Sequence, residues 1–311
     1  MLAFDDDRAF ALLDFRMRVL LPAQYQDSTE EVQPVPMGSA GLKFGPDGKV
    51  AWDEIWQSFC DLAMAGGPPH KGTLLEPGPP DAIAAAPDRY REVVDEICRG
   101  VAMASELQAT GSPVPGRVRV RCFSDTMADW LLRAITMENV AATRAGEMDL
   151  DLPAAPHFRL DKEIKNVVTV VAKTTHYWMG HLARVHKADI GGLFALLSRE
   201  LPLLEPEPAV GPDTATTRRA VAVAIERQAA LQAVDHRYQG WMGLAVPSIG
   251  AAVWMMRALV AGNVLARREG ETLFVPINVA TDPAGDLLAP RVALVHRLAT
   301  RRRPGVTGRA R

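Results

Sequence analysis

Cysteine is scarce in this sequence, with three residues in 311. Cys60, Cys98 and Cys122 form neither a Cys-x-x-Cys pair nor an even set. A disulfide framework and a zinc ribbon are therefore not expected. Such sparse cysteine is typical of a reducing compartment, so we expect a cytoplasmic protein.

Long apolar runs are also lacking. The best stretch, 246–264, is interrupted by a proline, two glycines and an arginine, and it does not reach the ~18 apolar residues of a membrane span. The acidic run Asp5–Asp7 has the wrong sign for a signal peptide. We therefore expect no membrane partner.

Neither charge sign is in excess, since 35 basic and 37 acidic residues give a net charge of −2. This balance disfavours nucleic acid or an acidic membrane as the partner of the whole chain. The exception is 301–311, which carries five arginines. We expect a disordered tail there, with nucleic-acid contact through it as a minor alternative.

Recognised catalytic motifs are missing as well. The sequence contains no GxSxG, HExxH, Walker or EF-hand pattern. An enzyme and a non-catalytic protein therefore both remain open, and no cofactor or metal is implied.

An internal repeat is the clearest positive signal. A shift of 124 residues aligns 116–154 with 240–278 without a gap, and 12 of the 39 positions are identical. Chance gives about two or three identities at this composition. A weaker alignment, at a shift of 116, pairs His70-Lys71 with His186-Lys187. The identities at the shift of 124 include Gly116/Gly240, Ser124/Ser248, Trp130/Trp254, Arg133/Arg257 and Asn139/Asn263.

We therefore expect an α/β fold, with α+β as the alternative. A strand-helix-helix-strand-helix-strand unit is duplicated in tandem, and the copies pair as a pseudo-two-fold pseudo-dimer. A homo-oligomer is compatible with this arrangement. The expected parts are an N-terminal helix and loop (1–41), a first repeat (42–154), a second repeat (157–279), a C-terminal helix (280–300) and the tail (301–311).

Hydrophobic periodicity and turn signals place the elements more finely. Helices are expected at 5–21, 52–65, 89–108 and 126–142, and strands at 42–44, 118–122 and 148–152.

The segment 66–72, Gly-Gly-Pro-Pro-His-Lys-Gly, is the most unusual loop. Gly66 and Gly67 give an open backbone that a ligand can approach, Lys71 supplies a cation and His70 a titratable ring. The alternative is a connector, because the segment follows an expected helix C-terminus, whose dipole disfavours anions.

Arginine recurs three residues after tryptophan in both repeats, on one helix face. Arg133 and Arg257 are therefore candidate clamps for an anionic ligand. The alternative is that each tryptophan is core, while each arginine caps carbonyls or binds a carboxylate across the pseudo-symmetric interface.

His176 and Tyr177 end a polar cluster that could line a pocket. His70 and His176 are the tentative catalytic residues, and Tyr177 is a candidate ligand-binding residue. His176, His181 and His186 are spaced by five residues. On an α-helix this spacing leaves neighbours ~140° apart, so a shared metal is not expected.

Small-molecule binding ranks first among the possible functions. We expect an enzyme or binder for an anionic carboxylate or phosphate metabolite, with its site near 66–71 and the interface between the repeats. A non-catalytic interaction or scaffold protein is the alternative.

Overall fold

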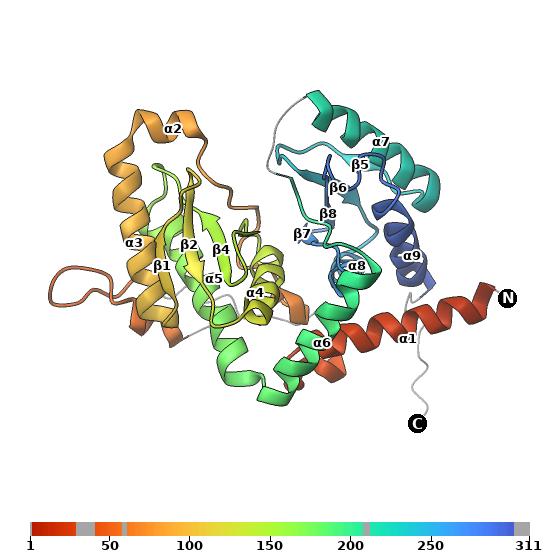
Figure 1. The fold of residues 1–311 in the computed structure, drawn as a ribbon, viewed down its shortest axis with the longest axis horizontal. Helices are drawn as coiled ribbons and strands as arrows, with labels where there is room; N and C mark the ends of the chain where they lie inside the picture. The colour runs from red at the N-terminus through yellow and green to blue at the C-terminus, as the bar shows by residue number, and fades with distance from the viewer. Residues whose placement is uncertain (1, 29–40, 58–60, 208–211, 302–311) are drawn as a thin grey trace. The chain divides into compact units, whose positions relative to one another are not determined.

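The computed structural model describes residues 2–28, 41–57, 61–207 and 212–301. They divide into two compact units, each built of helices and one small antiparallel sheet (Figure 1). Unit A comprises Leu21–Tyr25 and Gln33–Phe194, and unit B comprises Met1–Leu20, Gln26–Val32 and Ala195–Arg311. Within the described ranges, no helix has the length and apolar character needed to cross a membrane.

Unit A contains a four-stranded sheet of order β1-β2-β4-β3. Helix α3 packs against β1, β2 and α5 (Figure 1). Val118 and Val120 of β2 face this core and are at most 1% exposed. The elements are two 3₁₀ helices (Trp52–Gln57 and Ala63–Ala65), α2 (Pro80–Ala85), α3 (Pro87–Ser105), β1 (Gln108–Gly111), β2 (Arg117–Arg121), α4 (Asp125–Met137), β3 (Thr143–Arg144), β4 (Asp149–Pro153), α5 (Lys165–His176) and most of α6 (Arg184–Glu200).

Two π-helical segments flank α5, at Leu160–Ile164 and Tyr177–His181. A further 3₁₀ helix, Ala23–Ser28, follows α1.

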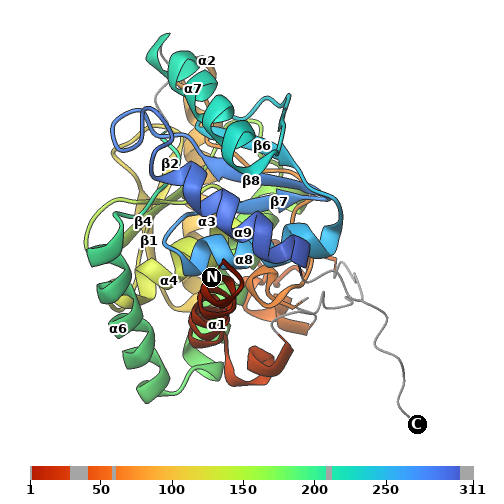
Figure 2. The ribbon, with the colours of Figure 1, turned by 90° about the vertical axis from the view of Figure 1, so that its right-hand side faces the viewer.

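Unit B contains the second sheet, of order β5-β6-β8-β7. Helix α8 packs on α1 and α9, and α9 also packs on α7 (Figures 1 and 2). The elements are α1 (Leu2–Leu20), α7 (Pro212–Ala229), β5 (Ala233–Val234), β6 (Trp241–Ala245), α8 (Ile249–Ala261), β7 (Arg267–Glu269), β8 (Thr272–Pro276) and α9 (Leu288–Arg301).

The two sheets share one strand order and matching registers. Ala109 pairs with Val120 in unit A, and Ala233 pairs with Leu244 in unit B, an offset of 124 on both strands. In each unit the order is helix, strand, strand, helix, strand, strand. The fold is thus mixed α and β with small antiparallel sheets, and this element order differs from the predicted one.

Helix ends correspond too. Ser124 and Ser248 cap α4 and α8 by accepting a hydrogen bond from the backbone N–H three residues later. Asn139 and Asn263 adopt left-handed backbone conformations, with φ of 62° and 65°. Asparagine tolerates this region better than most residues. The sequence repeat is therefore accompanied by shared local geometry.

The side chains of Asn139 and Asn263 each bind a segment that comes earlier in the chain, and these two segments therefore correspond between the units. Asn139 Nδ2 donates to Lys71 O at 2.7 Å, and Asn263 Nδ2 donates to Leu201 O at 2.8 Å. Leu201 thus occupies in unit B the position that Lys71 has in unit A. The weaker alignment, which pairs Lys71 with Lys187, is wrong at this point.

The β3–β4 and β7–β8 hairpins differ in turn length by one residue. Thr143 pairs with Asp151 in unit A, whereas Arg267 pairs with Phe274 in unit B. The offset is 124 on the first strand and 123 on the second, because the second turn is one residue shorter. The gapless alignment is therefore out of register beyond the turn.

The segment before the sheet in unit A is less regular than predicted. The strand expected at 42–44 is a single bridge from Phe44 to Val50. In the described parts of the helix expected at 52–65, the structure has short 3₁₀ helices at Trp52–Gln57 and Ala63–Ala65, and Leu62 is extended, with ψ of 137°. Trp52 is fully buried and its indole N–H donates to Glu96 at 2.8 Å, so a tertiary contact rather than a helix face holds it.

The C-terminal helix begins later than predicted, at Leu288 rather than 280. Asp282 accepts hydrogen bonds from the backbone N–H groups of Leu287 and Leu288, which fixes the preceding turn. Arg301, predicted to start the tail, ends α9 and pairs with Asp6 at 2.6 Å. The rest of the predicted tail, 302–311, lies outside the described residues.

Candidate functional site

The first two glycines of the 66–72 loop are required by backbone conformation and packing within unit A. Gly66 has φ of 97° and ends a 3₁₀ turn. A Cβ at Gly67 would lie 2.6 Å from the carbonyl oxygen of Asp61. The open backbone thus accommodates the protein's own chain, which supports the connector interpretation for these two residues.

A buried ion pair holds the loop. Glu138 and Lys173 are both 0% exposed, and their side chains meet at 2.8 Å. Glu138 also accepts hydrogen bonds from the backbone N–H groups of Ala63 (2.9 Å) and His70 (2.7 Å). Sequence analysis did not select Glu138, because unit B has Gly262 at the corresponding position.

His70 does not titrate near neutral pH. Burial lowers its pKa to about 4, against a smaller opposing effect of Glu138. A pKa of about 4 leaves the ring neutral at pH 7, and the role of His70 as a tentative catalytic residue stays a prediction.

Lys71 lies among other cations. Burial lowers the pKa of Lys71, Glu163 raises it, and Lys162, Arg159 and Lys165 lower it again. Glu163 is within 4 Å of both Arg159 (3.6 Å) and Lys162 (3.8 Å). One carboxylate thus serves several cations, and the region around Lys71 is positively charged.

Arg133 is part of the packing of α4. It is 3% exposed, its guanidinium lies 4.1 Å from the ring centroid of Phe194, and it donates to Asp129 O at 2.8 Å. Trp130, one turn earlier, contacts Trp178 with ring centroids 5.6 Å apart. These contacts match the structural alternative for the Trp-x-x-Arg motif.

Arg257 is the corresponding residue of α8 and is differently placed. It is 2% exposed, and none of its three guanidinium nitrogens has a hydrogen-bond partner in the described structure. Burial lowers its pKa to about 10, while Asp14 of α1 raises it. Trp254 stacks on Phe10 of α1 at 5.9 Å, so this helix face also packs against a helix.

Tyr177 is joined to the segment before the loop by a chain of contacts. Its hydroxyl is 2.8 Å from that of Tyr25, which donates to Asp61 Oδ1 at 2.6 Å. Lys173 Nζ donates to the backbone oxygen of Asp61 at 3.1 Å. Burial is the largest effect raising the pKa of Tyr25. Tyr177 is thus linked through Tyr25 to Asp61, which precedes the loop.

His176 and His181 meet, contrary to the prediction from their spacing. Their Nε2 atoms are 3.1 Å apart. The prediction assumed an α-helix, whereas Tyr177–His181 is π-helical. Residues five apart lie on one face of a π-helix, since each turn closes with an i→i+5 hydrogen bond.

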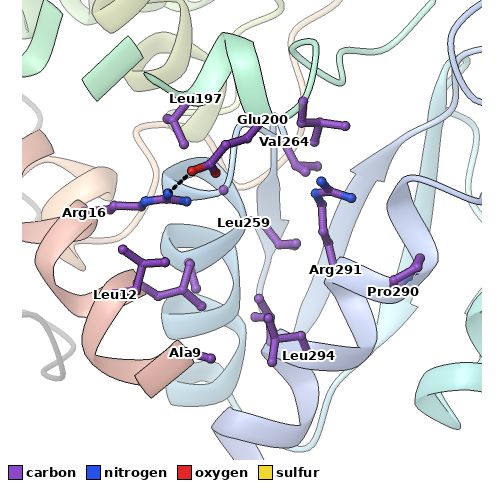
Figure 3. A pocket seen from close by; sticks show the side chains of 15 residues that line it. Ala9, Leu12, Arg16, Leu197, Glu200, Leu259, Val264, Pro290, Arg291 and Leu294 are labelled. Carbon is purple, nitrogen blue, oxygen red and sulfur yellow. Dashed lines mark hydrogen bonds and ion pairs between the residues drawn. The ribbon is translucent and has the colours of Figure 1, made fainter. Parts of the chain in front are cut away.

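Sequence analysis missed a pocket in unit B (Figure 3). Its volume is about 300 Å³ and its walls come from α1, α8, α9 and the end of α6. No local pattern could reveal it, because the lining residues are far apart in the sequence. They are Ala9, Leu12, Leu13, Arg16, Leu197, Glu200, Leu201, Ala258, Leu259, Gly262, Val264, Pro290, Arg291, Leu294 and Val295.

Three charged side chains gather at one end of this pocket (Figure 3). Arg16, 7% exposed, pairs with Glu200 at 2.6 Å, and its buried Nε has no hydrogen-bond partner in the described structure. Arg291 donates to Leu287 O at 2.7 Å. Burial lowers the pKa of Arg291, whereas Asp282 and Glu200 raise it. The other end is apolar, with Ala9 and Leu294.

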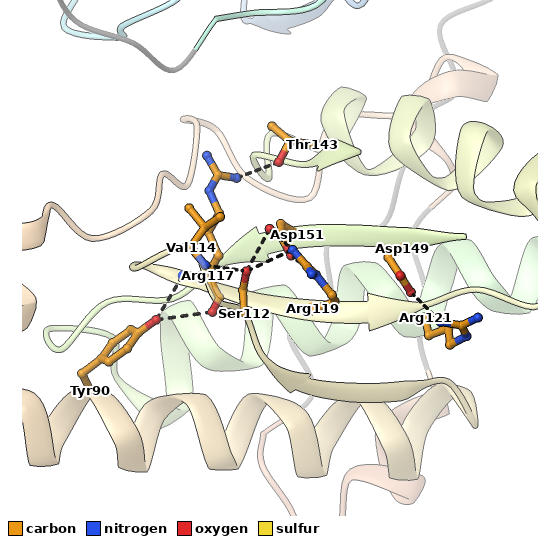
Figure 4. A network of polar contacts seen from close by, with 9 residues as sticks. All are labelled: Tyr90, Ser112, Val114, Arg117, Arg119, Arg121, Thr143, Asp149 and Asp151. Carbon is orange, nitrogen blue, oxygen red and sulfur yellow. Dashed lines mark hydrogen bonds and ion pairs between the residues drawn. The ribbon is translucent and has the colours of Figure 1, made fainter. Parts of the chain in front are cut away.

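The polar face of the first sheet carries three arginines on β2 (Figure 4). Arg119 binds Asp151 through two hydrogen bonds of 2.9 and 3.0 Å. Arg121 lies 3.6 Å from Asp149, and Arg117 donates to Thr143 at 3.0 Å. Neighbouring side chains therefore engage these arginines, and the face is not a ready anion site.

Comparisons with protein-family models, with curated proteins and with solved structures found no match.

Proposed function

We propose that unit B binds a small amphipathic anion, a carboxylate with an apolar body, in the pocket between α1, α8 and α9. The observation that carries the proposal is the lining of that pocket, apolar at one end and bearing Arg16, Glu200 and Arg291 at the other. Ligand pockets commonly combine apolar walls with a few convergent polar groups.

The charges favour one negative group on the ligand. Arg16 and Arg291 contribute two positive charges and Glu200 one negative charge, which leaves a net charge of +1. Arg16 already pairs with Glu200, so Arg291 is the main partner for the ligand. A guanidinium binds a carboxylate through two parallel hydrogen bonds, and this geometry favours a planar carboxylate.

The volume limits the size of the apolar body. A water molecule occupies about 30 Å³ in the liquid, so ~300 Å³ holds roughly ten non-hydrogen atoms. A straight-chain or aryl carboxylate of about that size fits, whereas a nucleotide is too large. The proposal concerns binding and includes no reaction.

The experiment compares octanoate with octanol and octanamide by calorimetry and thermal shift. We expect octanoate to bind most tightly, and Arg291→Met to weaken it at least tenfold with little effect on octanol. Arg227→Met, at an exposed position on α7, is the matched control and should change nothing. Ala9→Phe, which fills the apolar end, should weaken all three ligands.

Equal binding of octanoate to wild type and Arg291→Met, or no binding of any of the three ligands, would contradict the proposal.

The cations around Lys71 favour a second candidate site, for a phosphate-bearing metabolite in unit A. Its support is the charge of Arg159, Lys162 and Lys165 near Lys71, which lowers the pKa of Lys71, with Glu163 acting in the opposite direction. Lys71→Ala should then reduce stabilisation by inorganic phosphate while leaving octanoate binding unchanged. Stabilisation by phosphate that is the same in wild type and Lys71→Ala would contradict this second site and leave only the one in unit B.

We further propose that the units contain two copies of one duplicated segment. Support comes from the sequence identities, the shared strand order and the paired Asn139 and Asn263 contacts. The pseudo-two-fold arrangement remains a prediction. A crystal structure in which the 87–153 and 212–276 segments superpose poorly would contradict the duplication.

A further inference from the structure

The π-helical turn after α5 builds a pair of imidazoles that the proposed function does not use. His176 immediately precedes this turn and His181 ends it. Both side chains are exposed to solvent, so an ion can reach them. π-helical turns are rare and frequently occur at functional sites. On an α-helix, histidines five residues apart would point in different directions, but on this π-helical turn they lie on the same face.

The hydrogen bonds of the pair orient His181. Its Nδ1 is 3.0 Å from the side-chain oxygen of Gln24, an acceptor, so Nδ1 carries the proton. The lone pair of His181 therefore lies on Nε2, which points at Nε2 of His176 at 3.1 Å. Metal-binding histidines commonly have such a second hydrogen bond, which fixes the tautomer and the ring.

The distance between the two nitrogens fits a shared metal ion. Metal–imidazole bonds are about 2.0–2.1 Å long. Two such bonds to nitrogens 3.1 Å apart enclose an angle of about 100°, between the 90° of square-planar or octahedral geometry and the 109° of tetrahedral geometry.

No group of three or more histidine, cysteine, aspartate or glutamate ligands occurs among the described residues. Water or a small exogenous ligand would therefore complete the coordination.

We propose that His176 and His181 form an open two-histidine site for a late first-row divalent ion, Cu²⁺, Ni²⁺ or Zn²⁺. Imidazole suits these ions, whereas Mg²⁺ and Ca²⁺ prefer oxygen ligands. The site is independent of the unit B pocket.

The test titrates untagged, metal-stripped full-length protein with NiCl₂ and ZnCl₂ by calorimetry. A His176→Ala/His181→Ala double variant gives the baseline for binding elsewhere, including cysteine. Wild type should bind one additional equivalent. Either single alanine variant should weaken that binding at least tenfold, whereas His186→Ala, the third member of the series, should not. Gln24→Ala should weaken it several-fold, because the tautomer is no longer fixed.

Cu²⁺ electron paramagnetic resonance provides a structural readout. We expect hyperfine coupling to two imidazole nitrogens in wild type and to one in each single variant. Binding indistinguishable from that of the double variant, or an equal loss in His186→Ala, would overturn the proposal and leave a simple histidine–histidine hydrogen bond.

Discussion

The Glu138–Lys173 pair provides the most demanding test of the unit A architecture. Both side chains are 0% exposed and they meet at 2.8 Å. Removing one partner of a buried ion pair leaves an uncompensated charge and costs about 3–5 kcal/mol. Glu138→Gln also weakens acceptors for two backbone N–H groups, those of Ala63 and His70, and an unsatisfied buried donor costs about 1–3 kcal/mol.

We therefore expect Glu138→Gln and Lys173→Met each to lower the free energy of unfolding by about 3–5 kcal/mol. The double variant buries neither charge, so its loss should be at least about 2 kcal/mol smaller than the sum of the single losses. Urea denaturation followed by circular dichroism and tryptophan fluorescence measures all four proteins. Additive losses, or a Lys173→Met variant within 1 kcal/mol of wild type, would refute the reasoning.

The other predictions concern burial and strain. Arg257→Met should raise the free energy of unfolding by about 1–3 kcal/mol, because it removes a buried guanidinium that makes no hydrogen bond within the described residues. Arg133→Met should lower it, because the Arg133 guanidinium donates a hydrogen bond to Asp129 O. Thermal unfolding of the two variants measures both effects. The pKa values of His70 and His236 are lowered to about 4, so their contribution to the free energy of unfolding should be fully present above pH ~6.5 and be lost as the pH falls toward 4. Urea unfolding at pH 7, 5.5 and 4.5 measures this loss, which should be smaller in His70→Asn. Gly116→Ala should sharply reduce the urea midpoint, because φ is 81° and the new Cβ would lie 2.5 Å from a carbonyl oxygen; an unchanged midpoint would contradict this.

The sequence predicts the parts of the fold that depend on local signals. Helix α4 starts one residue before the predicted 126, because Ser124 is a strong N-cap. Strand β2 lies within one residue of the predicted 118–122, because its valines alternate with arginines. Helix α3 likewise follows the apolar periodicity predicted for 89–108.

Tertiary contacts decide what the sequence does not predict. The 52–65 segment has the apolar periodicity of a helix, yet the hydrogen bond from Trp52 to Glu96 holds its start and Leu62 is extended. His176 and His181 appear unrelated until the π-helical turn is seen. The unit B pocket depends on four elements that meet only after folding.

The assembly of unit B has a consequence for synthesis on the ribosome. Its first helix packs through Phe10 on Trp254, and Asp6 pairs with Arg297 and Arg301, so these partners of α1 follow it by more than 240 residues. At about 5–20 residues per second, α1 waits on the order of 10–50 s before they are made. Its apolar face, including Met17, is exposed to chaperones and to neighbouring nascent chains during that interval. Unit A, whose contacts are closer in sequence, can fold first.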